Sequence, residues 1–130
     1  MRRDKFEGLV QLALRSIPAE FRDRIQNLAI IVEDEPDPQL LDEMEVPDEE
    51  TLFGLYHGIP LTERTWDYGN RLPDRITIFQ GPHEREYDEN EMITAIGETL
   101  IHEIGHYFGM SEDEIEEIEE NYWRKQTGED

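Results

Sequence analysis

Two histidines and a glutamate stand at a spacing that suits metal-dependent hydrolysis. His102 and His106 are four residues apart in an apolar stretch with helical periodicity, and Glu103 follows the first histidine directly. On a helix of about 3.6 residues per turn, side chains four apart share one face, so both imidazoles can bind the same ion. A glutamate beside them can take a proton from a zinc-activated water. The spacing therefore predicts a zinc site with Glu103 as general base.

A catalytic zinc ion needs a third protein ligand, because such sites combine three side chains with one water. Gly109 can end the helix in a left-handed conformation and turn the chain back towards the ion. Glu112 and Asp113 follow this turn. We expect Glu112 to be the third ligand and keep Asp113 as the alternative. Glu112 also follows the cap residue Ser111, so a place in the first turn of the next helix, without a metal, is open as well.

Periodicity predicts the elements that must position these groups. Residues 6–17 carry apolar side chains at helical spacing up to Pro18, and a short helical turn follows through residues 21–25. Apolar runs at 28–32, 52–57 and 75–79 predict three strands, the last bounded by Gly81-Pro82. The acidic segment 36–50 predicts a loop with one helical turn at 39–44. A small mixed sheet results.

The helices around the motif have their own start signals. Asp88 and Glu91 resemble a capping box that opens the motif helix, whose apolar stripe continues to Gly109. Ser111 and Glu114 repeat the cap signature and predict a final helix. The glutamates of residues 112–120 alternate with apolar residues at helical spacing, which is typical of a solvated helix face.

Other polar residues are weaker candidates for the site. Glu98, one turn before His102, can orient that imidazole as a hydrogen-bond acceptor, and a plain surface glutamate is the alternative. His57 and His83 fall at a strand end or in a loop, where surface residues are expected. Spacing does not select a donor for the developing oxyanion; the candidates are Tyr56, Tyr68, Tyr87, Tyr107, His57 and Arg71.

Composition limits the site and its partners. The chain has 130 residues and no cysteine, so the metal ligands must be imidazole and carboxylate groups, and one domain over residues 1–130 is expected. A net charge of −21 argues against nucleic acid or anionic lipid, so a partner should be a neutral or basic peptide or protein substrate. An acidity that only aids solubility or suits a salty or hot habitat is an equally open reading of the same charge. Neither a signal peptide nor a membrane-spanning stretch is evident, so a cytoplasmic protein is expected.

The motif resembles the extended zinc signature of the metzincin peptidases, in which a His or Asp ligand follows the glycine turn by three residues. Glu112 holds that position here, and it departs from the pattern. The methionine turn that metzincins carry further downstream has no counterpart, because none of the four methionines follows Ser111.

The whole chain is more similar to the minimal zincins, a family of small bacterial zinc metallopeptidases. The resemblance covers residues 6–115 and is carried by Pro18 with Phe21, Asp34-x-Pro36, Leu55-Tyr56-x-Gly58-x-Pro60, Leu72-Pro73-Asp74-x-Ile76 and His102-Glu103-x-x-His106-x-x-Gly109. It implies an α+β fold, a compact zincin-like single domain whose small mixed β-sheet packs on helices that include the motif helix. It also implies Zn²⁺ as the cofactor.

Functions of different classes agree with these residues. The favoured one is a zinc-dependent metallopeptidase in which His102, His106 and Glu112 hold Zn²⁺ and Glu103 is the base. The alternative is a metal-stabilised module that binds a peptide or protein with little or no turnover, since a short chain leaves few residues to position a substrate. An acidic interaction protein without metal ranks last.

Overall fold

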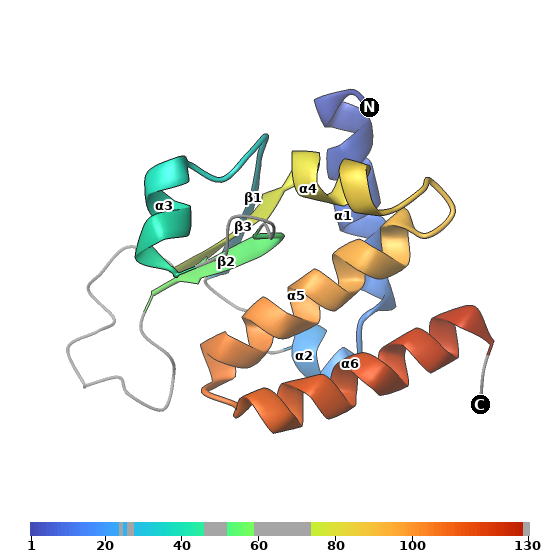
Figure 1. Ribbon diagram of the computed structural model, residues 1–130. Helices are drawn as coiled ribbons and strands as arrows, with labels where there is room; N and C mark the ends of the chain where they lie inside the picture. The colour runs from blue at the N-terminus through green and yellow to red at the C-terminus, as the bar shows by residue number, and fades with distance from the viewer. Residues whose placement is uncertain (24, 26–27, 46–51, 59–73, 129–130) are drawn as a thin grey trace.

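The fold combines six helices with a three-stranded sheet in the residues that the structure, a computed structural model, describes, namely 1–23, 25, 28–45, 52–58 and 74–128. The elements in chain order are α1 (Arg3–Ser16), α2 (Ala19–Arg22), β1 (Leu28–Glu33), α3 (Pro38–Glu43), β2 (Gly54–His57), β3 (Asp74–Phe79), α4 (Gln80–Glu86), α5 (Met92–Phe108) and α6 (Glu112–Thr127). In Figure 1, α5 lies between the sheet and α6. The α+β class predicted from the sequence is confirmed.

The sheet is mixed, as expected, with the strand order β1-β3-β2. β1 runs parallel to β3, and β2 runs antiparallel to it, with Tyr56 opposite Ile76. The central strand β3 is almost wholly buried, and the side chains of Ile76 and Ile78 are fully covered. β2 is an edge strand, and it contacts α5, the helix that carries the histidine motif.

The hydrophobic core lies between the sheet, α1 and α5. Ile96, Leu100 and Ile104 form the predicted apolar stripe of α5, and they are fully buried in one cluster with Phe6 and Val10 of α1. Burying each such side chain contributes about 1.5–3 kcal/mol, so this packing holds the motif helix in place. No helix in the described part of the chain is long and apolar enough to cross a membrane.

Most predicted elements are confirmed, with ends shifted by a few residues. The strand expected over 52–57 begins at Gly54, and the short turn expected through residue 25 ends at Arg22. The helical turn in the acidic loop is α3, where the side chain of Asp37 accepts a hydrogen bond from the backbone N–H of Gln39 at 2.8 Å. The rest of that loop belongs to residues 46–51, which lie outside the described residues.

Of two expectations about the approach to α5, one is confirmed and one is wrong. β3 ends at Phe79, before Gly81-Pro82, as expected, and the pair lies in the first turn of α4, where proline is tolerated because the first N–H groups of a helix have no intrahelical partner. Asp88 does not cap α5. Its Oδ1 accepts a hydrogen bond from the backbone N–H of Glu91 at 3.1 Å and closes a turn, and Glu91 is itself the N-cap, without a side-chain cap bond.

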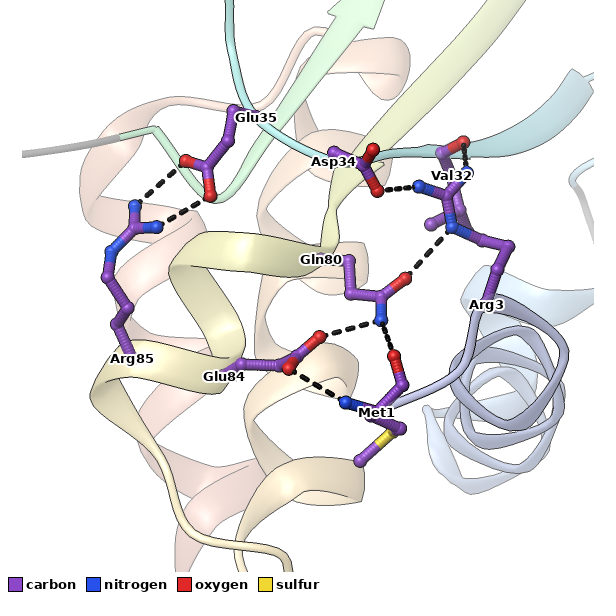
Figure 2. Close-up of polar contacts among 8 residues, drawn as sticks. All are labelled: Met1, Arg3, Val32, Asp34, Glu35, Gln80, Glu84 and Arg85. Atoms are coloured by element: carbon purple, nitrogen blue, oxygen red, sulfur yellow. Dashed lines mark hydrogen bonds and ion pairs between the residues drawn. The ribbon is translucent and has the colours of Figure 1, made fainter.

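Polar contacts tie the start of α1 to the end of β1 and the start of α4 (Figure 2). The guanidinium of Arg3 donates from Nε to the side-chain oxygen of Gln80 at 2.9 Å and from Nη1 to the carbonyl of Val32 at 3.0 Å, and it pairs with Asp34. Three elements that are distant in the sequence therefore meet at one arginine.

His83 is buried, against the expectation of a surface position. It lies on α4 with no exposed area, and its Nδ1 lies 2.7 Å from the carbonyl oxygen of Phe79 while its Nε2 lies 2.9 Å from the hydroxyl of Thr99. Burial lowers the pKa of His83 below its ordinary value, so the folded state keeps it neutral. The residue joins α4 to α5 and is not part of the metal-ligand cluster described below.

This burial predicts a pH-dependent stability. Between pH 6.5 and the lower pKa of the folded state, the unfolded chain binds a proton at His83 more readily than the folded protein does. The free energy of unfolding should therefore fall by up to about 1.4 kcal/mol per pH unit as the pH drops through this range. Urea unfolding of wild type and His83→Gln at pH 7.5, 6.5 and 5.5 measures the difference. The variant should show the shallower decline, and parallel pH profiles would contradict the assignment.

Candidate metal centre

His102, His106 and Glu112 come together at the end of α5 and the start of α6. One potential ligand atom from each lies within 4.8 Å of the other two. Nε2 of His106 is 2.9 Å from one oxygen of Glu112, and Nε2 of His102 is 3.8 Å from the other. In a tetrahedral zinc site with bonds of about 2.0–2.1 Å, ligand atoms are about 3.3 Å apart. The observed separations lie on either side of that value.

The turn after α5 brings Glu112 to the histidines. Gly109 ends α5 in the left-handed region, at φ 76°, and the N–H of Met110 bonds the carbonyl of Gly105 at 3.0 Å. Ser111 then caps α6 through the predicted capping box with Glu114. The chain therefore reverses within a few residues, and the first residue of α6 faces the end of α5. Asp113 is exposed and does not belong to the ligand cluster.

Close packing of α6 on α5 supports this turn. A Cβ atom added at Gly105 would lie 2.6 Å from Cγ1 of Ile115, a separation that side chains do not adopt. Ile115 itself is fully buried. The glycine between the two histidines is thus what lets α6 lie against the motif helix.

Glu119, rather than Glu98, accepts a hydrogen bond from His102. Nδ1 of His102 lies 2.7 Å from a carboxylate oxygen of Glu119, whose side chain is only 17% exposed. The expectation that the glutamates of α6 all lie on a solvated face is therefore wrong at this position. Glu98 instead accepts from the indole N–H of Trp123. Burial raises the pKa of Glu98 to about 7, and the nearby charge of Glu119 acts in the same direction.

The hydrogen bond with Glu119 also sets the charge and orientation of His102. It raises the pKa of His102 to about 9, against a smaller opposing effect of burial, and the charges of neighbouring carboxylates add to the rise. The ring is then protonated at neutral pH in the absence of a metal, and an ion at Nε2 must displace that proton. With Nδ1 donating to Glu119, Nε2 is the atom that points to the ligand cluster.

Replacing Glu119 should weaken the site without removing a ligand. Glu119→Gln keeps the shape and an acceptor oxygen but loses the charge, so the zinc dissociation constant should rise about 10–100-fold. Calorimetric titration of zinc into chelator-stripped protein measures this. Glu116→Gln, at an exposed position of the same helix, changes the net charge equally and should bind zinc as wild type does. Equal affinities in both variants would contradict the role given to Glu119.

Glu103 lies beside the cluster and is held by the edge strand β2. Glu103 is 6% exposed, and its Oε1 accepts a hydrogen bond from the backbone N–H of Tyr56 at 2.9 Å. The same oxygen is 3.8 Å from Nδ1 of His106. Burial raises the pKa of Glu103, opposed by the positive charge of the two histidines and by the Tyr56 N–H. A carboxyl group with a raised pKa beside a cluster of metal-ligating side chains is suited to accept and return a proton.

Two contacts hold β2 where the backbone N–H of Tyr56 can reach Glu103. The hydroxyl of Tyr56 donates to the carboxylate of Asp74 at 2.5 Å, which links β2 to the start of β3. At Gly54 a Cβ atom would lie 2.7 Å from Cγ2 of Thr99, so only a glycine lets β2 approach α5 so closely. The backbone N–H that holds Glu103 carries no sequence signal, and the spacing of side chains could not reveal it.

Two of the other candidate residues, His57 and Tyr107, lie outside the ligand cluster. His57 lies at the end of β2, and burial, with the charge of Arg75, lowers its pKa. Tyr107 is buried, and its ring packs at 5.9 Å from that of Tyr56. Tyr68 and Arg71 belong to a segment outside the described residues.

The donor set suits zinc. Two imidazoles and one carboxylate form one of the known combinations of catalytic zinc sites, and no thiolate competes because the chain lacks cysteine. The Glu119 contact to Nδ1 of His102 is the outer hydrogen bond that zinc-bound histidines typically make.

Comparisons with known proteins identify the family of the chain and a similar fold. The sequence profile of the zincin-like metallopeptidases matches residues 25–122, and the chain belongs to that family. A solved structure, a conserved hypothetical protein from Thermus thermophilus, superposes with a TM-score of 0.55 at 20% identity, over 83% of this chain and 94% of the other. This likeness concerns the fold alone. No curated protein sequence matches the chain.

Proposed function

We propose that this protein is a zinc-dependent peptidase in which His102, His106 and Glu112 hold Zn²⁺. The observation that carries the proposal is the meeting of these three side chains, with Glu103 buried beside them. Membership of the zincin-like metallopeptidase family supports the reaction class.

Glu103 is the general base in this proposal. When bound, Zn²⁺ supplies a Lewis acid that polarises the peptide carbonyl and lowers the pKa of water. Glu103 takes the proton of the attacking water and returns it to the departing amine, for which its raised pKa is suited. The N–H of Tyr56 holds one carboxylate oxygen, so the proton is exchanged at the other.

The substrate in this proposal is a peptide or an unfolded protein segment that is neutral or basic. The net charge of −21 attracts cationic chains and repels nucleic acids and anionic lipids. The alternative, a metal-stabilised binding module, would bind the same class of partner and leave it intact.

Metal removal provides the test. Protein treated with a chelator should lose peptidase activity on a mixture of unstructured peptides, and one equivalent of zinc should restore most of it. Mass spectrometry of the peptides measures both steps. Zinc-loaded protein that binds peptides but cleaves none would favour the binding module instead.

A further inference from the structure

A cavity of about 350 Å³ opens directly beside the metal-ligand cluster. It lies between β2, α5, α6 and the residue that follows α4, and its lining includes His102 and Glu103. Pockets that hold small ligands or single side chains begin at about this size. A group in this cavity would lie next to the atoms that the proposed function assigns to catalysis.

The polar part of the lining is acidic. Glu98 and Glu119 join Glu103 on the wall, and the one described lining residue that carries a positive charge, His102, is paired with Glu119. Both added carboxylates are largely withdrawn from solvent: Glu119 is engaged by His102, and Glu98 by the indole of Trp123. Withdrawn carboxylates interact more strongly with an entering charge than exposed ones do, because water screens them less.

The apolar part of the lining is aromatic. Phe53 and Tyr87 line the cavity with their ring centroids 6.0 Å apart, and Trp123 lies 6.5 Å beyond Tyr87. Such rings can cover the aliphatic part of a long side chain and attract a cation at its end. The cavity thus offers an apolar wall and an acidic wall within one space.

We propose that this cavity binds a lysine or arginine side chain of the peptide substrate and so sets the specificity of cleavage. The inference rests on the proposed peptidase function, because the cavity shares His102 and Glu103 with that site. The methylene groups of the bound side chain lie against Phe53 and Tyr87, and its charge meets Glu98 and Glu119. An acidic side chain is rejected by like charge.

The test compares peptides that differ in one side chain. Blocked octapeptides of neutral sequence carry either lysine or norleucine at one position. Binding to the metal-free full chain, where no turnover interferes, is measured by calorimetry at pH 8, because Glu98, with a pKa of about 7, is then mostly ionised. Lysine should be favoured at least about tenfold, as expected for a close charge pair. Hydrolysis of the same peptides by zinc-loaded protein should show the same order of preference.

Glu98→Gln is the decisive variant. It conserves shape, keeps an oxygen for the Trp123 N–H and removes one of two adjacent carboxylates, so the fold should persist. The lysine preference should fall below about threefold in this variant and stay unchanged in Glu116→Gln, which carries the same change in net charge outside the cavity.

The outcomes separate the two proposals. A preserved lysine preference in Glu98→Gln, equal binding of both peptides, or no binding of the lysine peptide would overturn the assignment of the cavity. A lysine preference in binding with no hydrolysis by zinc-loaded protein would contradict the peptidase function and leave the cavity assignment in place. Hydrolysis without a preference for lysine would contradict the cavity assignment and leave the peptidase function in place.

Discussion

Replacing Glu103 with glutamine is expected to lower kcat/KM for peptide hydrolysis by about 10²–10⁴-fold, the usual contribution of a positioned general base. The variant keeps the size of the side chain and an oxygen that can accept the N–H of Tyr56, so the fold should be unchanged. It cannot take up a proton. Hydrolysis of a peptide that the wild type cleaves, followed under zinc saturation, measures the loss.

The same variant should bind zinc nearly as well as wild type, because Glu103 is not among the three clustered ligands. This pairing of lost turnover with retained metal separates a base from a ligand. Glu116→Gln, at an exposed site on α6, is the matched control and should retain full activity. Activity in Glu103→Gln close to that of wild type would require another base.

Replacing His106 with alanine is expected to abolish stabilisation of the fold by zinc. Zinc at 100 times its dissociation constant adds about 2.7 kcal/mol to the free energy of unfolding of a protein that binds it only when folded, which corresponds to about 10 °C in Tm for a domain of this size. The side chain of His106 is 36% exposed, so its removal should change the metal-free Tm far less.

Thermal unfolding with and without zinc tests this expectation. His57→Ala is the matched control, because it removes a half-buried histidine that lies outside the cluster, and it should keep the full zinc-induced shift. A His106→Ala variant that zinc stabilises as much as wild type would mean that the ion binds elsewhere.

The part of the site that could be predicted from the sequence depends on local geometry. His102 and His106 meet because they are one helical turn apart, and the reversal at Gly109 depends on a single left-handed residue. Glu112 follows within the next few residues, so its approach to the histidines also required little knowledge of the fold.

The features that the sequence did not predict depend on tertiary packing. Glu119 is 17 residues from His102, and it arrives there only because α6 packs closely against Gly105 of α5. In the sequence it is one of many similar glutamates. The N–H of Tyr56 comes from an edge strand, and any residue other than proline would supply it. The burial of His83 likewise follows from α4, whose Gly-Pro start predicts a loop.

The charge of the chain is a further case in which the sequence predicts a property but not its location. A net charge of −21 predicts the sign of a partner and does not locate its binding site. Only the fold shows that Glu98 and Glu119, from two different helices, line one cavity together with aromatic side chains.

The most direct test of the metal centre is a calorimetric titration of zinc into chelator-stripped wild-type protein, with Glu112→Ala and Asp113→Ala alongside. The three-ligand site predicts saturable binding of one zinc ion per chain, weakened at least about tenfold in Glu112→Ala and unchanged in Asp113→Ala. No saturable binding to the wild type, or equal binding in Glu112→Ala, would contradict it.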